Sequence, residues 1–317
     1  MIHHLYNILY IYKMKITGLI IYNSYKLYIK HLEAIKKGCE LLEIPFICVN
    51  DMNEIMNLPH NFIWSPADLM NDKYLINKKV MYGPYFFYLP NNEFIGHIDF
   101  SKYYNAYYNC LTDWNMKMYE EYGEWKIPLI SLPLGMSNIN IMLNKKSNDE
   151  IFIFLKYRNI ALYEYIAKVL YYTNYKVNFI KYPTHNESFD EKEFIKIIKS
   201  CKFGIWIGSH ETFRYEYLEV LNNDIPLLVI DVKSMKQECN EDNYRIHTNK
   251  NLFATSIPYW SEKCGEVLYD ILEFEDKLKT IENGILCNKY NPKKFIIDNM
   301  NPSTCLINIL TKFDFIL

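Results

Sequence analysis

Short apolar runs alternate with amphipathic segments along the first half of the chain. Helices are expected where apolar residues recur at helical spacing, at Leu27–Leu42, Met52–Asn57 and Thr112–Tyr122. Strands are expected at the apolar runs rich in β-branched and aromatic residues, at Lys15–Tyr22, Pro45–Asn50, Asn61–Ser65, Lys79–Tyr82, Phe86–Leu89 and Pro128–Leu132. The run Asn105–Leu111 fits either a strand or a short helix.

The polar segment Asn138–Glu150 predicts a linker, after which the same alternation starts again. Strands are expected at Ile151–Leu155, Lys176–Lys181, Phe203–Ile207 and Leu227–Ile230. Helices are expected at Ala161–Tyr172, Glu191–Ser200, Phe213–Leu221 and Cys264–Lys279, with a helical tail at Pro292–Leu317. Such alternation predicts parallel sheets covered on both faces. We therefore expect an α/β fold of two Rossmann-like domains that face each other across a cleft.

Ligands of open parallel sheets bind outside the carboxyl ends of the strands, and the loop after Phe203–Ile207 carries the strongest pattern. Glu211 and Glu219 stand in a Glu-x7-Glu spacing around the start of the predicted helix. With Thr212 as N-cap, the free amides of the first turn would face the strand end and attract a phosphate. The alternative is that both glutamates are solvated helix charges, which this spacing alone would favour.

Two further strand-end or loop clusters could belong to the same site. Lys156 and Arg158 follow the strand Ile151–Leu155 and could neutralise a diphosphate through charge-assisted hydrogen bonds. The alternative is a pair of surface cations. Pro258, Tyr259 and Trp260 form a rigid aromatic loop that could line the cleft, and ordinary loop packing explains it equally well.

The stretch ETFRYEYLEVLNNDIPLLV resembles a segment of GT-B glycosyltransferases, especially the retaining GT4-type enzymes. Glu211, Phe213, Glu219 and Pro226 match its order and spacing. The resemblance implies that the first glutamate contacts the donor sugar and the second the ribose of a nucleotide. The chain departs from the pattern at four positions. Arg214 stands where the family usually has glycine, which is the clearest departure. Thr212 and Asp224 stand where the family commonly has glycine, and Glu216 stands where it commonly has proline.

The resemblance implies transfer of a sugar from a nucleotide-diphosphate sugar to a glycan, protein or lipid acceptor, with retention and without a metal or other cofactor. It implies an acceptor-side domain at residues 1–140, a donor-binding domain at 141–290 and a tail at 291–317 that packs back on the first domain. The expected donor-binding residues are Lys156, Arg158, Gly208, Ser209, Thr212, Phe213, Arg214 and Glu219. The expected acceptor-side residues are Ser65, Gly83 and Pro84.

Catalytic roles are expected for Glu211 and for His97 as a general base, with His60 and His185 as alternatives. In a retaining transfer the leaving phosphate could itself take the proton. The chain contains no DxD-type metal motif. A GT-B-fold nucleotide-sugar epimerase and a non-catalytic nucleotide-sugar- or protein-binding relic remain open as alternatives, because fold does not fix function.

Composition narrows the remaining function classes. The 317 residues carry a net charge of −2 without a sustained basic run, which argues against nucleic-acid binding. The 8 cysteines are scattered, so we expect reduced thiols in a cytoplasmic protein rather than a metal site. The apolar segment Leu5–Tyr12 is too short to span a bilayer, which leaves peripheral membrane contact at most. The high content of Tyr, Ile, Lys and Asn fits an AT-rich genome.

Overall fold

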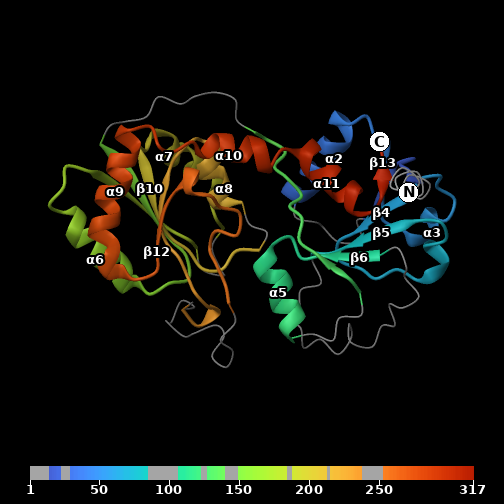
Figure 1. Ribbon diagram of the computed structural model, residues 1–317, viewed down its shortest axis with the longest axis horizontal. Helices are drawn as coiled ribbons and strands as arrows, with labels where there is room; N and C mark the ends of the chain where they lie inside the picture. Colours follow the sequence, from blue (N-terminus) through green and yellow to red (C-terminus); the bar gives the residue numbers. More distant parts are fainter. Residues whose placement is uncertain are drawn as a thin grey trace, which may run out of the picture. The chain divides into compact units, whose positions relative to one another are not determined.

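The chain forms two compact α/β units (Figure 1). The computed structural model describes residues 14–22, 29–84, 106–122, 127–139, 149–183, 188–212, 215–237 and 253–317. Unit 1 comprises Met1–Asn138 and Asn299–Leu317, and unit 2 comprises Ile139–Asp298. Several predicted features lie outside the described residues, namely the segment Leu5–Tyr12, the strand Phe86–Leu89, His97, His185, Phe213 and Arg214.

Unit 1 is built on a parallel sheet whose described strands follow the order β3-β2-β4-β5-β6-β7. The strands are β2 (Leu19–Tyr22), β3 (Phe46–Val49), β4 (Phe62–Ser65), β5 (Lys79–Tyr82), β6 (Ala106–Asn109) and β7 (Leu129–Ile130). Every residue of β2 and β4 is buried. This is why both strands are almost continuously apolar rather than alternating.

Helices of unit 1 include α2 (Ile29–Leu41), α3 (Met52–Ile55), α5 (Asp113–Tyr122) and α11 (Pro302–Lys312). The C-terminal helix α11 lies beside α2 (Figure 1). The two helices approach closely at Gly38, where a Cβ atom would lie 2.8 Å from the carbonyl oxygen of Pro302. The residues Asn299–Leu317 thus belong to the first unit.

In unit 1, a short strand near the start of the described chain pairs in parallel with a short strand at its end. Strand β13 (Phe315–Ile316) pairs with β1 (Met14–Lys15), and the buried ring of Phe313 lies 4.8 Å from that of Phe62 and 5.0 Å from that of Tyr107. The predicted strand Lys15–Tyr22 is therefore two strands, because Ile16–Gly18 belong to neither. The predicted helical tail is likewise broken into α10 (Pro292–Asn299), α11 and β13.

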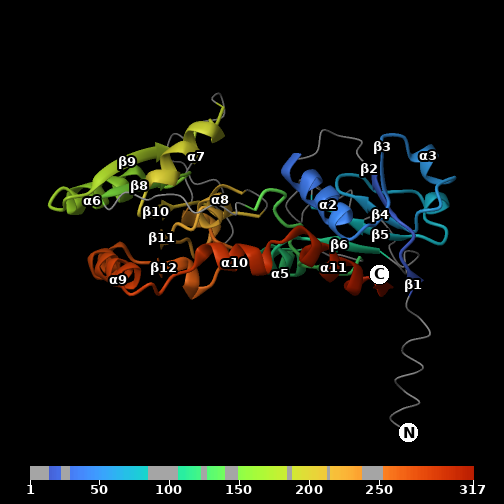
Figure 2. The same cartoon turned by 90° about the horizontal axis from the view of Figure 1, so that it is seen from above.

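Unit 2 contains a second parallel sheet, whose described strands follow the order β12-β11-β10-β8-β9 (Figure 2). They are β8 (Glu150–Leu155), β9 (Lys176–Lys181), β10 (Phe203–Ile207), β11 (Leu227–Ile230) and β12 (Gly265–Leu268). The first described strand of the unit lies between the second and the third, which is one of the two common orders of doubly wound α/β sheets.

Helices cover both faces of this second sheet. Helices α6 (Ile160–Leu170) and α9 (Phe274–Leu286) pack into one apolar core with alternate residues of β8 and β10. On the opposite face Phe154 contacts Phe194 of α7 (Glu191–Ser200), and Trp206 contacts Tyr217 of α8 (Glu216–Asn222). Successive residues of the strands thus pack against helices on opposite faces of the sheet, as the two-residue period of a strand requires.

The predicted helix Cys264–Lys279 is wrong in its first part. The chain forms strand β12, pairs in parallel with β11, and enters α9 only at Phe274 after a 3₁₀ turn at Ile271–Glu273. Gly265 has φ +141°, and a Cβ atom there would lie 1.9 Å from the carbonyl oxygen of Leu227. Pairing with a strand distant in sequence overrides the local helical pattern, which reports only short-range spacing.

We expect Phe313→Ala to destabilise unit 1 by about 3 to 5 kcal/mol, because it removes a buried aromatic ring from the contact between the C-terminus and the sheet. Hydrogen exchange followed by mass spectrometry should show faster exchange in β2, β4 and α2 and unchanged exchange in β8 and β10. Leu317→Ala is the matched control, since Leu317 is 59% exposed. Equal protection in both variants would show that the tail does not stabilise the first sheet.

Candidate functional site

The ends of β8 and β10 form the topological switch point of unit 2. These strands are adjacent in the sheet although β9 lies between them in the sequence. The backbone N–H of Lys156, just beyond β8, donates to the carbonyl oxygen of Ile207 at the end of β10, at 3.0 Å. The chain then continues into α6 on one face of the sheet and α8 on the other. Ligands of doubly wound sheets bind in the crevice that such diverging loops create.

A buried ion pair lies at this switch point. Lys156 Nζ contacts Glu211 Oε1, and the two side chains are each 3% exposed. The ammonium group also lies 4.9 Å from the ring centroid of Tyr182, within cation–π distance. The backbone N–H of Glu211 donates to the carbonyl oxygen of Thr255 at 3.0 Å, which fixes the loop after β10. Two predicted site residues that are far apart in the sequence are therefore in direct contact.

Burial raises the pKa of the Glu211 carboxyl to about 7. The Lys156 ammonium beside it favours the charged form and lowers this pKa, whereas the negative charge of Glu216 raises it further. Desolvation is the largest of these effects because a carboxylate loses its hydration inside the protein. The carboxyl is thus able to gain or lose a proton near neutral pH.

Arg158 ties the ends of two strands together. Its Nη1 donates to the carbonyl oxygens of Gly208 and Ile230, at 3.0 and 3.2 Å. Gly208 is required at this position, because a Cβ atom would lie 2.4 Å from Nε1 of Trp206 and 2.8 Å from Cβ of Ser256. Arg158, Gly208 and the adjacent Ser209 are all buried. The alternative prediction, in which Arg158 is a surface cation, is therefore wrong.

Asp231 is a site component that the motif analysis did not select. It directly follows β11 and is 2% exposed. Its carboxylate accepts hydrogen bonds from Thr255 Oγ1 at 2.7 Å and from the N–H and Oγ of Ser256 at 2.6 and 2.8 Å. An aspartate immediately after the apolar run Leu227–Ile230 was the available sequence signal. The carboxylate holds the loop of Thr255 and Ser256 against Gly208.

The aromatic loop Pro258–Trp260 is attached to α8. The backbone N–H of Tyr259 donates to the hydroxyl oxygen of Tyr217 at 3.2 Å. Tyr217 is buried, while Pro258, Tyr259 and Trp260 are partly exposed. The loop is thus fixed next to the switch point by Tyr217 on one side and by Asp231 on the other.

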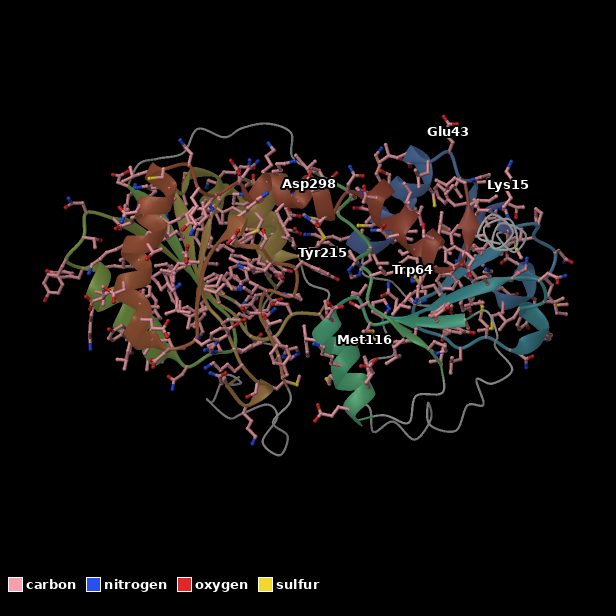
Figure 3. The ribbon with its side chains drawn as sticks, in the orientation of Figure 1. Lys15, Glu43, Trp64, Met116, Tyr215 and Asp298 are labelled. Atoms are coloured by element: carbon pink, nitrogen blue, oxygen red, sulfur yellow. The ribbon has the colours of Figure 1, made fainter. Side chains whose placement is uncertain are left out.

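The predicted start of the helix after β10 is wrong. Helix α8 begins at Glu216 with Tyr215 at the N-cap position (Figure 3), and no side chain caps it. Thr212 is partly exposed and lies in the loop, which the hydrogen bond from Glu211 to Thr255 holds away from helical geometry. Glu219 consequently lies in the first turn of α8 rather than two turns into a helix. This helix has only 7 residues, so we assign no anion site to its N-terminus.

The predicted acceptor-side residues lie together in unit 1. Ser65 ends β4 and is buried, and its hydroxyl donates to the carbonyl oxygen of Asp68 at 2.5 Å. The N–H of Gly83 donates to the carbonyl oxygen of Ser65, and the hydroxyl of Tyr108 donates to the carbonyl oxygen of Pro84. Trp64 (Figure 3) donates through Nε1 to the carbonyl oxygen of Gly83 at 2.9 Å. These residues shape the loops at the carboxyl ends of β4 and β5.

The histidine predictions are only partly addressed by the described residues. His60 precedes β4, which begins at Phe62, and therefore lies at the amino-end edge of the sheet. This position does not fit a base at the carboxyl ends of the strands.

Among the described residues, no group of three or more His, Cys, Asp and Glu side chains could hold a metal ion. In the same part of the chain, no helix is long and apolar enough to cross a membrane.

No protein-family model matches the chain, and no curated protein matches it either. Its structure is similar to that of a glycosyltransferase from Rickettsia africae ESF-5, with a TM-score of 0.54 and 11% sequence identity over 94% of this chain and 98% of that one. The likeness confirms the predicted fold class of two Rossmann-like domains. The GT4-type assignment stays a prediction.

Weaker likenesses involve three further solved structures. The lipopolysaccharide outer core galactosyltransferase WaaB, in its apo form, gives a TM-score of 0.49 at 11% identity over 94% of this chain and all of that one. A mutant of TarM from S. aureus, in complex with Fondaparinux, alpha-GlcNAc-glycerol and UDP, gives 0.45 at 13% identity over 84% of this chain. The chain spans only 55% of that TarM chain and 60% of the matched chain in the GtfA/B complex.

We expect Lys156→Met to destabilise the protein by an amount that grows above about pH 7, to about 3 kcal/mol or more at alkaline pH. Without Lys156 the pKa of Glu211 rises further, since the cation that lowers it is gone. Glu211 of the folded variant then keeps its proton at a pH where Glu211 of the unfolded chain is ionised. The free energy of unfolding of the variant therefore continues to fall as the pH rises above about 7, where that of the wild type no longer does. Urea unfolding of wild type and variant between about pH 6 and pH 9 measures the difference.

Lys156→Met/Glu211→Gln is the matched control for this effect. It removes both charges, so its stability relative to wild type should not vary over the same alkaline range. A Lys156→Met deficit of equal size at both ends of the range would show that the carboxyl does not titrate in the folded protein.

Proposed function

We propose that the chain is a glycosyltransferase that binds a nucleotide-diphosphate sugar at the carboxyl ends of β8 and β10. The observation that carries this proposal is the buried Lys156–Glu211 pair at the switch point of unit 2. A cation at this position suits a diphosphate, and a carboxylate in contact with it suits the hydroxyls of a sugar. Perturbed carboxyl groups at the strand-end crevice of a Rossmann-like unit are common in functional sites.

Lys156 would hold the diphosphate and stabilise the charge of the leaving group. When the bond between the anomeric carbon and the phosphate oxygen breaks, its electron pair stays on that oxygen. A buried ammonium group stabilises such a charge more strongly than a solvated one, because the surrounding medium screens less. Arg158 would support this role indirectly, since it fixes the strand ends through the carbonyl oxygens of Gly208 and Ile230.

The proposed transfer proceeds with retention and without a metal. The acceptor oxygen bonds to the anomeric carbon on the face that the phosphate leaves, and its proton passes to the leaving phosphate oxygen. Glu211 would orient the sugar hydroxyls in the ionised form. Its pKa of about 7 makes this contact sensitive to pH. We assign acceptor binding to the unit 1 loops formed by Ser65, Gly83 and Pro84, which support one another by hydrogen bonds.

Glu219 is proposed to accept hydrogen bonds from the ribose of the nucleotide. It lies in the first turn of α8 and is partly exposed, unlike its buried neighbour Glu216. The carboxyl group of Glu219 is thus on the element that follows β10 and retains access to solvent. Ser209, Thr212, Phe213 and Arg214, between β10 and α8, complete the proposed donor-binding set.

We expect Glu219→Ala to weaken binding of UDP or GDP by about 10- to 100-fold, the loss typical of hydrogen bonds to a charged group. A thermal-shift comparison of UDP-, GDP-, ADP- and CMP-sugars identifies the donor first, because a bound ligand raises the unfolding midpoint. Calorimetric titration of the preferred nucleotide into wild type and variant then measures the loss.

Glu193→Ala is the matched control, since Glu193 has a side chain 52% exposed on α7 and pairs only with a surface lysine in the described contacts. It should bind the nucleotide as wild type does. Unchanged affinity in Glu219→Ala would exclude the ribose assignment. Stabilisation by none of the nucleotide sugars would exclude the donor site as a whole, and donor turnover without an acceptor would favour an epimerase.

A further inference from the structure

A second candidate site lies in unit 1, at the amino ends of β4 and β5. A cavity of about 390 Å³ opens between the turn that follows α3 and the turn that precedes β5. Its polar lining comes from His60, Asn61, Lys73, Tyr74, Asn77 and Lys78. This edge of the sheet is opposite to the one that carries Ser65 and Gly83. The cavity is therefore separate from every residue assigned above to donor or acceptor binding.

Lys78 places a cation in this cavity without a carboxylate partner among the lining residues. Its Nζ donates to the carbonyl oxygens of Leu58 at 2.8 Å and of His60 at 2.6 Å. An ammonium group has three donors, so these contacts use two of them. Burial lowers the pKa of Lys78, as expected for a cation that is partly desolvated. Neutral carbonyl groups fix the ammonium group in place and leave its positive charge uncompensated.

His60 forms a fixed part of the cavity lining. Its Nδ1 is buried and has no hydrogen-bond partner among the described residues. The ring packs against Gly18, where a Cβ atom would lie 2.2 Å from Cδ2 of His60. The imidazole therefore cannot shift toward the backbone of Gly18.

The rest of the lining combines a second cation with apolar surface. Lys73 is exposed, and its Nζ lies 4.7 Å from the ring centroid of Tyr74. Met56 and Ile76 also line the cavity, and they are 53% and 68% exposed. Exposed apolar side chains beside two lysines fit a ligand that has an anionic end and an apolar body. A cavity of this size lies near the lower limit for small-molecule sites.

We propose that this cavity binds a small phosphomonoester with an aromatic or aliphatic body. The phosphate would lie against Lys78 and Lys73, with the amide of Asn77 as a neutral donor. The body would lie on Tyr74, Met56 and Ile76. The same headgroup chemistry occurs in free phosphate esters and in phosphatidic acid, so the test includes both. This proposal does not depend on the glycosyltransferase assignment.

Phenyl phosphate is the probe, titrated calorimetrically into the 317-residue chain up to about 10 mM, a range that covers weak small-ligand affinities. We expect saturable binding and about tenfold or greater loss of affinity in Lys73→Met and in Lys78→Met, since each removes a charge-assisted contact. Lys78 also bonds two backbone carbonyl oxygens, so its variant could fold poorly. Lys73 has no such structural bond in the described contacts and keeps the test decisive.

Acetylation of lysines followed by mass spectrometry locates the ligand. Phenyl phosphate should protect Lys73 and Lys78 and leave Lys37 of α2 unprotected, which is 47% exposed. Lys37→Met is the matched control and should bind as wild type does. Absence of binding, or equal affinity in wild type and Lys73→Met, would overturn the proposal. Binding to phosphatidic acid vesicles but not to phosphatidylcholine vesicles would identify the lipid as the source, and phenyl phosphate alone would identify a soluble ester.

Discussion

The parallel register between β8 and β10 is the constraint on which the candidate donor site depends. Phe203 pairs with Ile151 and Ile207 with Leu155, so both strands end at the same row. Lys156 and Gly208 are then the first residues beyond that row. Because α6 and α8 cover opposite faces, the chain leaves the two strand ends in different directions. A shift of register would separate Lys156 from Glu211, although each residue would keep its place in the sequence.

Elements with strong local signals could be predicted from the sequence, while elements made by distant pairing could not. Strands β9, β10 and β11 and helix α7 have the predicted bounds, and α7 is capped by Asp190, which accepts from the N–H of Glu193. Strands β12 and β13 depend on β11 and β1, which lie far from them in the sequence. The contact between Lys156 and Glu211 spans 55 residues. The place of Lys156 after a predicted strand and the Glu-x7-Glu spacing of Glu211 mark both residues as candidates. Neither pattern shows that the two side chains contact each other.

Two buried carboxylates near the switch point have different parts in the structure. Asp231 accepts three hydrogen bonds from Thr255 and Ser256 and fixes their loop. Glu211 instead contacts a buried cation, and its pKa is raised to about 7. A buried ion pair adds little stability compared with apolar side chains of similar volume, because both charges lose hydration. Packing alone therefore does not account for Lys156 and Glu211, whereas the bonds of Asp231 explain its burial.

Strands β2 to β6 of unit 1 and β8 to β12 of unit 2 follow the same order, but the buried Lys156 and the partly buried Lys78 are compensated differently. Lys156 lies at carboxyl strand ends against a carboxylate, while Lys78 lies at amino strand ends against neutral carbonyl oxygens. An anion that approaches Lys156 must compete with Glu211, unless that carboxyl takes up a proton or turns to a neutral group of the ligand. An anion that approaches Lys78 has no such competitor among the lining residues. Binding at the first lysine is therefore coupled to the charge of Glu211, and binding at the second has no such coupling.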